Sequence, residues 1–181
     1  RIIIMPSFLV LTIIGPDRPG LVESLSQVVA DHDGNWLESR MSHLAGMFAG
    51  ILRVAVPEAR VDALRGALGE LQARGRRIIV ETSDAVDAGV DSRLLRLALI
   101  GNDRPGIVRE IAHALAERGV NVEELDTELV SAPMSGEPLF KATALLRAPA
   151  ALSLDELSDR LEELAHDLVV ELSLDDETDP S

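Results

Sequence analysis

The sequence lacks cysteine altogether and is poor in aromatic residues and lysine. Its 181 residues include no tyrosine, one tryptophan, three phenylalanines and a single lysine, Lys141. Without cysteine, neither disulfides nor cysteine–metal sites can form. No apolar run reaches the roughly 18–20 unbroken residues that a transmembrane helix needs, and residues 1–6 lack the pattern of a cleaved signal peptide. These absences predict a cytoplasmic protein that does not enter a membrane.

Basic charge is also scarce. The formal net charge is −14, with 11 acidic and nine basic residues in 1–90 but 20 acidic and eight basic residues in 91–181. Nucleic-acid binding draws its affinity from basic side chains, and single-strand binding adds aromatic stacking. We therefore expect no direct contact with nucleic acid. The acidity suits solubility or docking on a basic protein partner.

The chain is an internal repeat. The turn GPDRPGL at 15–21 reappears as GNDRPGI at 101–107, and a shift of 86 places Asn35 on Asn121. The shift grows to 92 after SAPMSGE at 131–137, an insertion rich in Pro, Ser and Gly. A period near 86 suits two copies of one small domain. The predicted limits are 1–84 for the first domain, 85–92 for a linker, 93–175 for the second domain and 176–181 for an acidic tail.

Each copy has the same predicted order of elements. An apolar run, 8–14 or 94–100, predicts a strand, and apolar residues at helical spacing follow the turn. Two hairpin strands, a second amphipathic helix and a final strand complete the copy. The order is βαββαβ, twice. It predicts an α+β protein of two tandem ferredoxin-like domains, with antiparallel sheets and the helices on one face. The other face needs cover from a second sheet or a dimer.

The repeated turn has two interpretations. Asp17 stands where a helix N-cap is expected, Pro19 suits the first helical turn, and Gly20 lets another group come close. The free N–H groups and the dipole of a helix N-terminus favour a carboxylate or phosphate. The same pattern is also typical of a helix cap with no ligand. The residues alone leave both interpretations open.

The order strand, GxDRPG(L/I)V, amphipathic helix and Asn-led strand resembles the ACT domain, a small regulatory module that often binds amino acids. The resemblance covers roughly 7–174, both copies. The stretches NWLESRMSHLAGMFAGILRVAVP and SAPMSGEPLFKA are similar to one subfamily, the glycine cleavage system transcriptional repressors. What the resemblance implies is a non-catalytic protein that senses a small amino acid, glycine or similar, at a domain–domain interface.

The resemblance also implies two ligand sites. Backbone N–H groups would take the carboxylate of the amino acid, and Asp or Asn oxygens its ammonium group. The sequence departs from the family pattern in two places: Asp33 replaces the glycine that often precedes the asparagine, and both turns carry Asp where many members carry Asn. The implied residues are Asp17, Arg18, Pro19, Gly20, Leu21 and Asn35 in the first copy, and Asp103, Arg104, Pro105, Gly106, Ile107 and Asn121 in the second.

The implied partner is a protein. Members of the subfamily act on a LysR-type activator rather than on DNA, so the resemblance implies a repressor that needs no cofactor, and we expect a homodimer. The insertion 131–137 and the acidic second half are the candidate partner surfaces, although 131–137 is equally compatible with a plain hairpin loop. No metal-ligand spacing, nucleophile motif or nucleotide-binding glycine pattern occurs, so we predict no catalytic or metal residue. The alternatives are a regulatory subunit or stand-alone ACT module that controls a metabolic enzyme, and a structural pairing module with vestigial sites.

Overall fold

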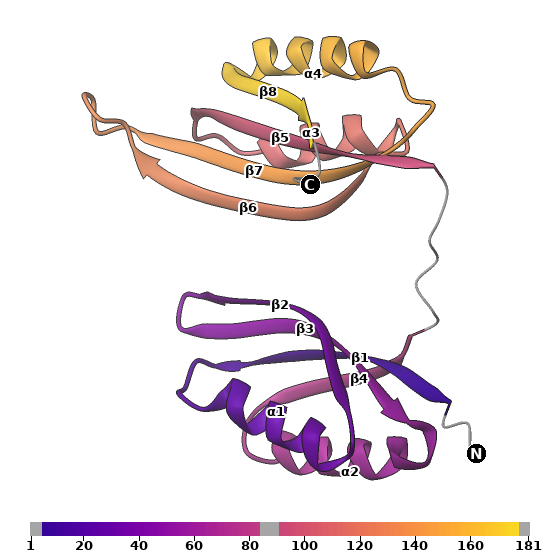
Figure 1. Ribbon diagram of the computed structural model, residues 1–181. Coiled ribbons are helices and arrows are strands. Elements are labelled where there is room, and N and C mark those ends of the chain that lie inside the picture. The colour runs from indigo at the N-terminus through magenta and orange to yellow at the C-terminus, as the bar shows by residue number, and fades with distance from the viewer. Residues whose placement is uncertain (1–4, 84–90, 178–181) are drawn as a thin grey trace. The chain divides into compact units, whose positions relative to one another are not determined.

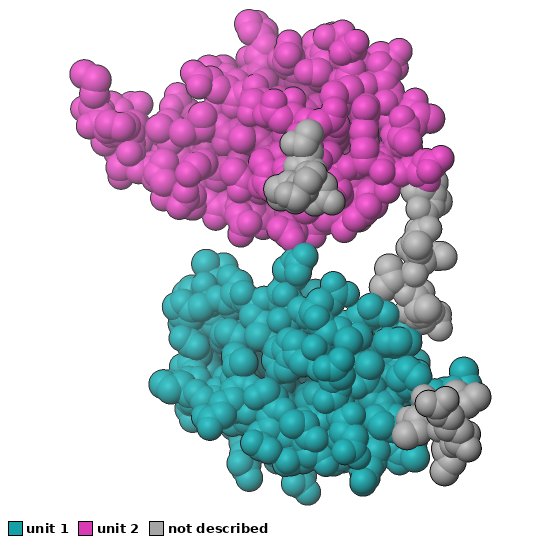
Figure 2. All heavy atoms as spheres, viewed as in Figure 1, with its two compact units in different colours: residues 1–87 teal, residues 88–181 magenta. Residues whose placement is uncertain are grey.

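The structure is a computed structural model that describes residues 5–83 and 91–177. The chain divides into two compact units, residues 1–87 and 88–181 (Figures 1 and 2). The predicted linker at 85–92 and acidic tail at 176–181 fall mostly on 84–90 and 178–181, outside the described residues. β5 begins at Ser92 and β8 ends at Asp176. The domain limits therefore stay a prediction.

The first unit confirms the predicted βαββαβ order. Its sheet has the strand order β2-β3-β1-β4, and every neighbouring pair is antiparallel. A short 3₁₀ turn, Glu58–Arg60, leads into the second helix. The elements are β1 (Pro6–Pro16), α1 (Leu21–Asp31), β2 (Asn35–Leu44), β3 (Met47–Pro57), α2 (Val61–Gln72) and β4 (Arg77–Thr82).

The second unit repeats this topology with the strand order β6-β7-β5-β8, again antiparallel throughout. The insertion forms the tip of the β6–β7 hairpin, where the Ala132 N–H donates to the Glu137 carbonyl at 2.9 Å. Its elements are β5 (Ser92–Asn102), α3 (Ile107–Ala116), β6 (Asn121–Ser131), β7 (Pro138–Pro149), α4 (Leu154–Leu168) and β8 (Val170–Asp176). Both units are therefore ferredoxin-like, as predicted.

One face of each sheet packs against its two helices. Alternate strand residues are buried there, such as Leu9, Leu11 and Ile13 of β1. In each unit the predicted apolar stripe of the first helix, α1 or α3, is buried against its own sheet. Alternation of period 2 on the strands and a stripe of period 3.6 on the helices are what one buried interface requires. No polar or charged residue is buried among the described residues. Each unit thus has its own apolar core.

The other face of each sheet carries different chemistry in the two units. In the first unit the middle row is Ile79, Thr12 and Ile51, read across β4, β1 and β3. The same row of the second unit is Ser173, Ala98 and Thr143. Both isoleucines are more than half exposed. The middle row of the open face is therefore largely apolar in the first copy and largely polar in the second.

The turn after the first helix explains one departure from the family pattern. Asp33 has a φ of 57°, and its counterpart Gly119 has a φ of 67°. The left-handed conformation is therefore required at this position in both copies, and it costs a residue with a Cβ about 1–2 kcal/mol. The Asp33 carboxylate also pairs with Arg60 at 3.1 Å, between two exposed side chains.

We expect Asp33→Gly to be more stable than Asp33→Ala by about 1 kcal/mol. Both variants lose the pair with Arg60, so their difference reports the backbone alone. Urea unfolding followed by circular dichroism measures the two free energies of unfolding. Equal stabilities would show that this turn relaxes away from positive φ when alanine is present.

Candidate functional site

The first strand–helix turn lies against the tip of the neighbouring hairpin. The Asp17 N–H donates to the Gly46 carbonyl at 3.0 Å, and an Asp17 carboxylate oxygen lies 3.7 Å from His43 Nε2. The second turn is anchored in the same way, because the Asp103 N–H donates to the Pro138 carbonyl at 3.2 Å. Long-range backbone contacts therefore fix both turns at the end of β1 and β5.

The predicted N-cap was wrong. The N-cap residue of α1 is Gly20, with a φ of 84°, and that of α3 is Gly106, with a φ of 95°. Neither helix has a side-chain cap. Pro19 lies before the helix and not in its first turn. The residue between Pro19 and the helix has a positive φ, which only glycine adopts without strain. The Asp17 carboxylate therefore does not occupy the N–H groups of its own helix.

The residue after each glycine is part of the core. Leu21 and Ile107 are buried beneath their helices, so of these two residues only the backbone N–H can reach a ligand. The other turn residues, Asp17, Arg18, Pro19, Asp103, Arg104 and Pro105, are exposed, as is Gly20, while Gly106 is half-buried. What each turn offers is an open helix N-terminus on the surface, flanked by one acidic and one basic side chain.

The charges around the two turns differ. The first helical turn of α1 contains Glu23, and the matching position of α3 is Arg109. Arg109 bonds the carboxylate of Glu110 at 2.6 Å, and that hydrogen bond, together with the charge of Arg109, lowers the pKa of Glu110. Arg104 contributes to the same pKa shift in a minor way. The second turn is consequently the more cationic environment for a negatively charged group.

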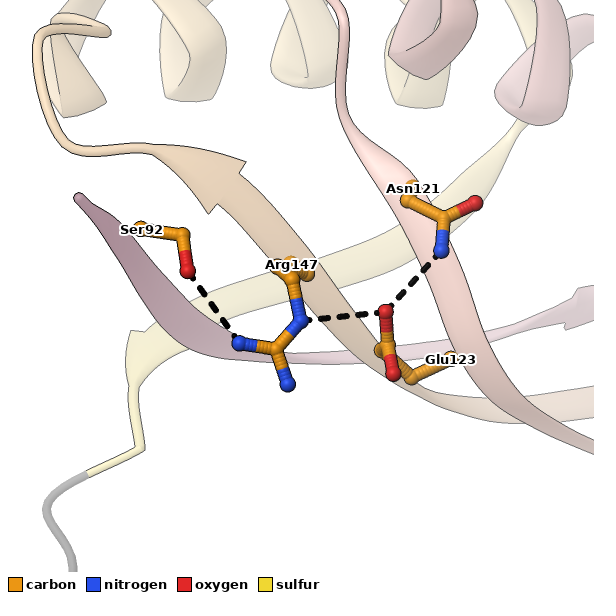
Figure 3. A network of polar contacts seen from close by, with 4 residues as sticks. All are labelled: Ser92, Asn121, Glu123 and Arg147. Atoms are coloured by element: carbon orange, nitrogen blue, oxygen red, sulfur yellow. Dashed lines mark hydrogen bonds and ion pairs between the residues drawn. The ribbon is translucent and has the colours of Figure 1, made fainter. Parts of the chain in front are cut away.

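Asn121 belongs to a polar network that the sequence did not predict (Figure 3). Its side-chain amide donates to Glu123 at 2.9 Å, and Arg147 Nε donates to the same Glu123 oxygen at 3.1 Å. Arg147 also donates to the Ser92 hydroxyl at 3.1 Å. In the first copy the positions of Glu123 and Arg147 are held by Leu37 and Ala55, so Asn35 cannot form this network.

The turn and the asparagine of one copy are not brought together. Asn35 on β2 lies opposite Ala55 on β3, which lies opposite Phe8 on β1. The turn follows Pro16, which is eight residues farther along β1 than Phe8. At about 3.4 Å per strand residue, the two lie roughly 27 Å apart. In the second copy, Asn121 lies opposite Arg147, which lies opposite Leu94. Leu94 is again eight residues from the end of β5, so Asn121 is equally far from the turn at 103–107. A small ligand cannot contact both groups within one unit.

A family model described as the ACT domain matches residues 7–81. A UPF0237 protein from Methanopyrus kandleri is 38% identical over 73 residues, which cover 40% of this chain and 79% of that protein. The chain belongs to the ACT-domain family. A second UPF0237 protein, from Methanocaldococcus jannaschii, is 36% identical over 56 residues, 31% of this ACT chain and 62% of that protein.

Two solved structures resemble the whole tandem ACT chain. A protein described as unknown, from Galdieria sulphuraria, has a TM-score of 0.82 and 29% identity over 96% of this chain and all of that one. A protein described as a "putative glycine cleavage system transcriptional repressor" has a TM-score of 0.71 and 18% identity over 97% and 99% of the two chains. At that identity the second likeness shows the fold, which is the tandem ACT arrangement.

The described part of the ACT chain offers little else for chemistry. Within 5–83 and 91–177, no three histidine or acidic side chains gather closely enough to hold a metal ion. The helices in these ranges are also too short or too polar to span a membrane. The two open helix N-termini and the Asn121 network are therefore the candidate sites.

Proposed function

We propose that this ACT protein is a non-catalytic regulator that binds a small amino acid, glycine first among the candidates, and acts on a protein partner. The observation that carries the proposal is the pair of strand–helix turns. Each ends on a glycine N-cap, and neither helix has a side-chain cap. The uncapped N–H groups and the helix dipole suit the carboxylate of an amino acid.

The ligand requires groups from two copies. Because the turn and the asparagine of one copy lie at opposite ends of its sheet, a ligand that touches both uses the turn of one copy and the asparagine of another. At the asparagine end of the second copy, the oxygens of Asn121 and Glu123 suit an ammonium group, which has three donors. A homodimer can supply this combination.

The two sites are unequal in this proposal. Near the second turn, Arg104 and Arg109 favour a carboxylate and Glu110 opposes it. The first turn has Arg18 beside Glu23, with no second arginine. The second asparagine is likewise held by Glu123 at 2.9 Å, so less rotamer freedom is lost when a ligand binds there. We therefore expect the turn 103–107 and Asn121 to contribute more of the affinity than their counterparts.

The proposed partner is an activator protein. The neighbour described as a glycine cleavage repressor supports a role in controlling those genes, and a LysR-type activator is the partner we propose. The net charge of −14 disfavours direct binding to DNA. For the amino acid to release the partner, it must bind the free regulator more tightly than the complex, and the same coupling factor then governs both ligands.

We expect the full chain to be stabilised by glycine or a related small amino acid. A ligand that binds only the folded state adds about 2.7 kcal/mol at 100 times its dissociation constant. Thermal unfolding against a panel that includes glycine and serine, over a wide concentration range, measures the shift. Methylamine and acetate serve as controls, because each retains only one of the two charged groups of glycine.

The variants Asn121→Ala and Arg109→Ala should reduce the shift more than Asn35→Ala and Glu23→Ala, the matched changes in the first copy. If no amino acid raises the melting temperature, the turns are helix caps and the sensor proposal fails. If one amino acid does raise the melting temperature, a pull-down with and without that amino acid identifies the partner class. Recovery of a metabolic enzyme, in place of a DNA-binding activator, would favour the alternative role as a regulatory subunit.

A further inference from the structure

β6 is a long strand at the edge of the second sheet (Figure 1). It has 11 residues, and all but Val130 are exposed. One edge of β6 pairs with β7, and the other carries backbone N–H and C=O groups that no strand of the sheet takes. Such an edge is a template for an added strand, and proteins commonly block it with Lys, Pro or a covering segment. β6 contains neither Lys nor Pro, and its one bulge lies near its start, between Val122 and Glu124.

The helix side of β6 is apolar but uncovered. Val122, Leu125 and Leu129 face the same side as the core residues of β7, yet they are 38%, 49% and 62% exposed. Between β6 and α3 lies an apolar cavity of about 50 Å³, and Val108 and Leu125 are among its lining residues. An added strand would lay alternate side chains over this groove and remove them from water.

The opposite side of β6 is acidic. Glu124, Asp126 and Glu128 alternate with Leu125, Thr127 and Leu129 and face the open side of the sheet. The neighbouring strand supplies Lys141, which pairs with Glu128 at 3.1 Å, and Arg147, which pairs with Glu123 at 3.1 Å. Arg96 of β5 lies close enough to Glu124 to interact with its charge. Side chains on the same face of neighbouring strands interact directly, and opposite charges stabilise the pair. The edge is therefore complementary to a strand with basic residues on this face.

A second copy of β6 does not fit this edge. Whichever direction the two strands run, matching their apolar sides sets one acidic row against the other, and like charges directly opposite destabilise a sheet. Offsetting the strands by one residue sets acidic side chains over the apolar groove instead. The equivalent row of β2 is Glu38, Arg40 and Ser42, with mixed charge, so the acidic edge is specific to the second copy.

We propose that the free edge of β6 accepts an extended segment of another protein, in which apolar side chains alternate with Lys or Arg, as an added strand of the second sheet. The apolar side chains cover Val122, Leu125 and Leu129, and the cations face Glu124, Asp126 and Glu128. The inference rests on the proposed function in one respect, that the regulator acts on a protein. The net charge of −14 accelerates the approach of a basic segment at low salt.

The probe is a labelled synthetic peptide in which Lys alternates with Val or Ile, titrated with the full chain by fluorescence polarisation. Two control peptides are used: one with the same composition but with the lysines and apolar residues in separate blocks, and one with Glu in place of Lys. We expect only the alternating peptide to bind specifically. Amide hydrogen exchange should slow within 121–131 when it binds.

Two variants of the protein locate the site, each with a matched control elsewhere. Asp126→Lys and Leu125→Asp should each weaken binding of the alternating peptide by at least about tenfold, corresponding to 1.4 kcal/mol. Glu70→Lys on the exposed side of α2 and Leu44→Asp on β2 introduce the same changes away from β6 and should leave the affinity unchanged.

Three results would overturn the inference. The block peptide could bind as tightly as the alternating peptide, or neither β6 variant could change the affinity. The third is self-association of the chain, measured by sedimentation, that Leu125→Asp abolishes. The last result would mean that a second copy occupies the edge. The amino-acid melting experiment tests Asn121, at the start of β6, and not Leu125 or Asp126, the residues that the peptide titration tests. A failed peptide titration beside a positive glycine shift therefore rejects the strand-addition site alone, and the reverse outcome rejects the sensor alone.

Discussion

Gly101→Ala is expected to destabilise the second unit by about 1–3 kcal/mol, the usual cost of forcing an extra methyl group into a packed interior. A Cβ at this position would lie 2.8 Å from Val170 Cα and would also collide with the Val170 Cγ1 methyl group. Gly101 is directly opposite Val170 in the β5–β8 ladder, so the strand backbone itself would have to move. Urea unfolding followed by circular dichroism measures the loss.

The matched change in the first copy is Gly15→Ala, which should be tolerated. A Cβ there meets Arg76 Cγ at 3.5 Å and no atom closer, because β4 begins one residue later, at Arg77. Alanine also restricts the unfolded chain, which stabilises a compatible site by about 0.4–1 kcal/mol. If both variants lose the same stability, the glycine that opens the repeated turn is required for its backbone conformation and not for the close approach of β8.

The sequence was sufficient to predict the fold because both copies carry the same two periodicities. The stripe of Ile107, Ile111, Ala114 and Leu115 is buried along α3, and the apolar runs 8–14 and 94–100 lie within the central strands β1 and β5. Burial of one face imposes these spacings on any sequence that forms such a layer. Agreement between two independent copies then made the element order clear.

The helix N-terminus could not be predicted in the same way. Asp17 has the right chemistry for an N-cap, but its backbone N–H is held by Gly46, far away in the sequence. The chain then needs three more residues and a positive φ at Gly20 before helix α1 begins. A local propensity scale does not contain this long-range contact, so it places the cap at the first suitable residue.

The Asn121 network was missed for a related reason. Arg147 lies on β7 and Ser92 on β5, so their meeting with Glu123 depends on strand register. A bulge between Val122 and Glu124 also breaks the period of two. Counting back from Leu125 by strict alternation therefore places Glu123 on the helix side, away from Arg147. The only signal in the sequence was the presence of Glu123 two residues after Asn121.

The last prediction tests which face of the second sheet is buried. Leu145 and Leu146 are neighbours on β7, but Leu146 is fully buried under the helices, whereas Leu145 is half-buried on the open face. We expect Leu146→Ala to cost about 2–5 kcal/mol, the range for buried leucine with an unfilled cavity. Leu145→Ala should cost less, since part of the surface that it removes is already in contact with water.

Equilibrium unfolding of both variants in the full chain measures the contrast, and the two substitutions are chemically identical and adjacent. A cost for Leu145→Ala close to that of Leu146→Ala would mean that the open face is covered in solution. The acidic row of Glu124, Asp126 and Glu128 shares that face with Leu145. In that case the cations of an added strand at β6 would have to compete with whatever covers it, and the affinity of the alternating peptide should rise in variants that uncover the face.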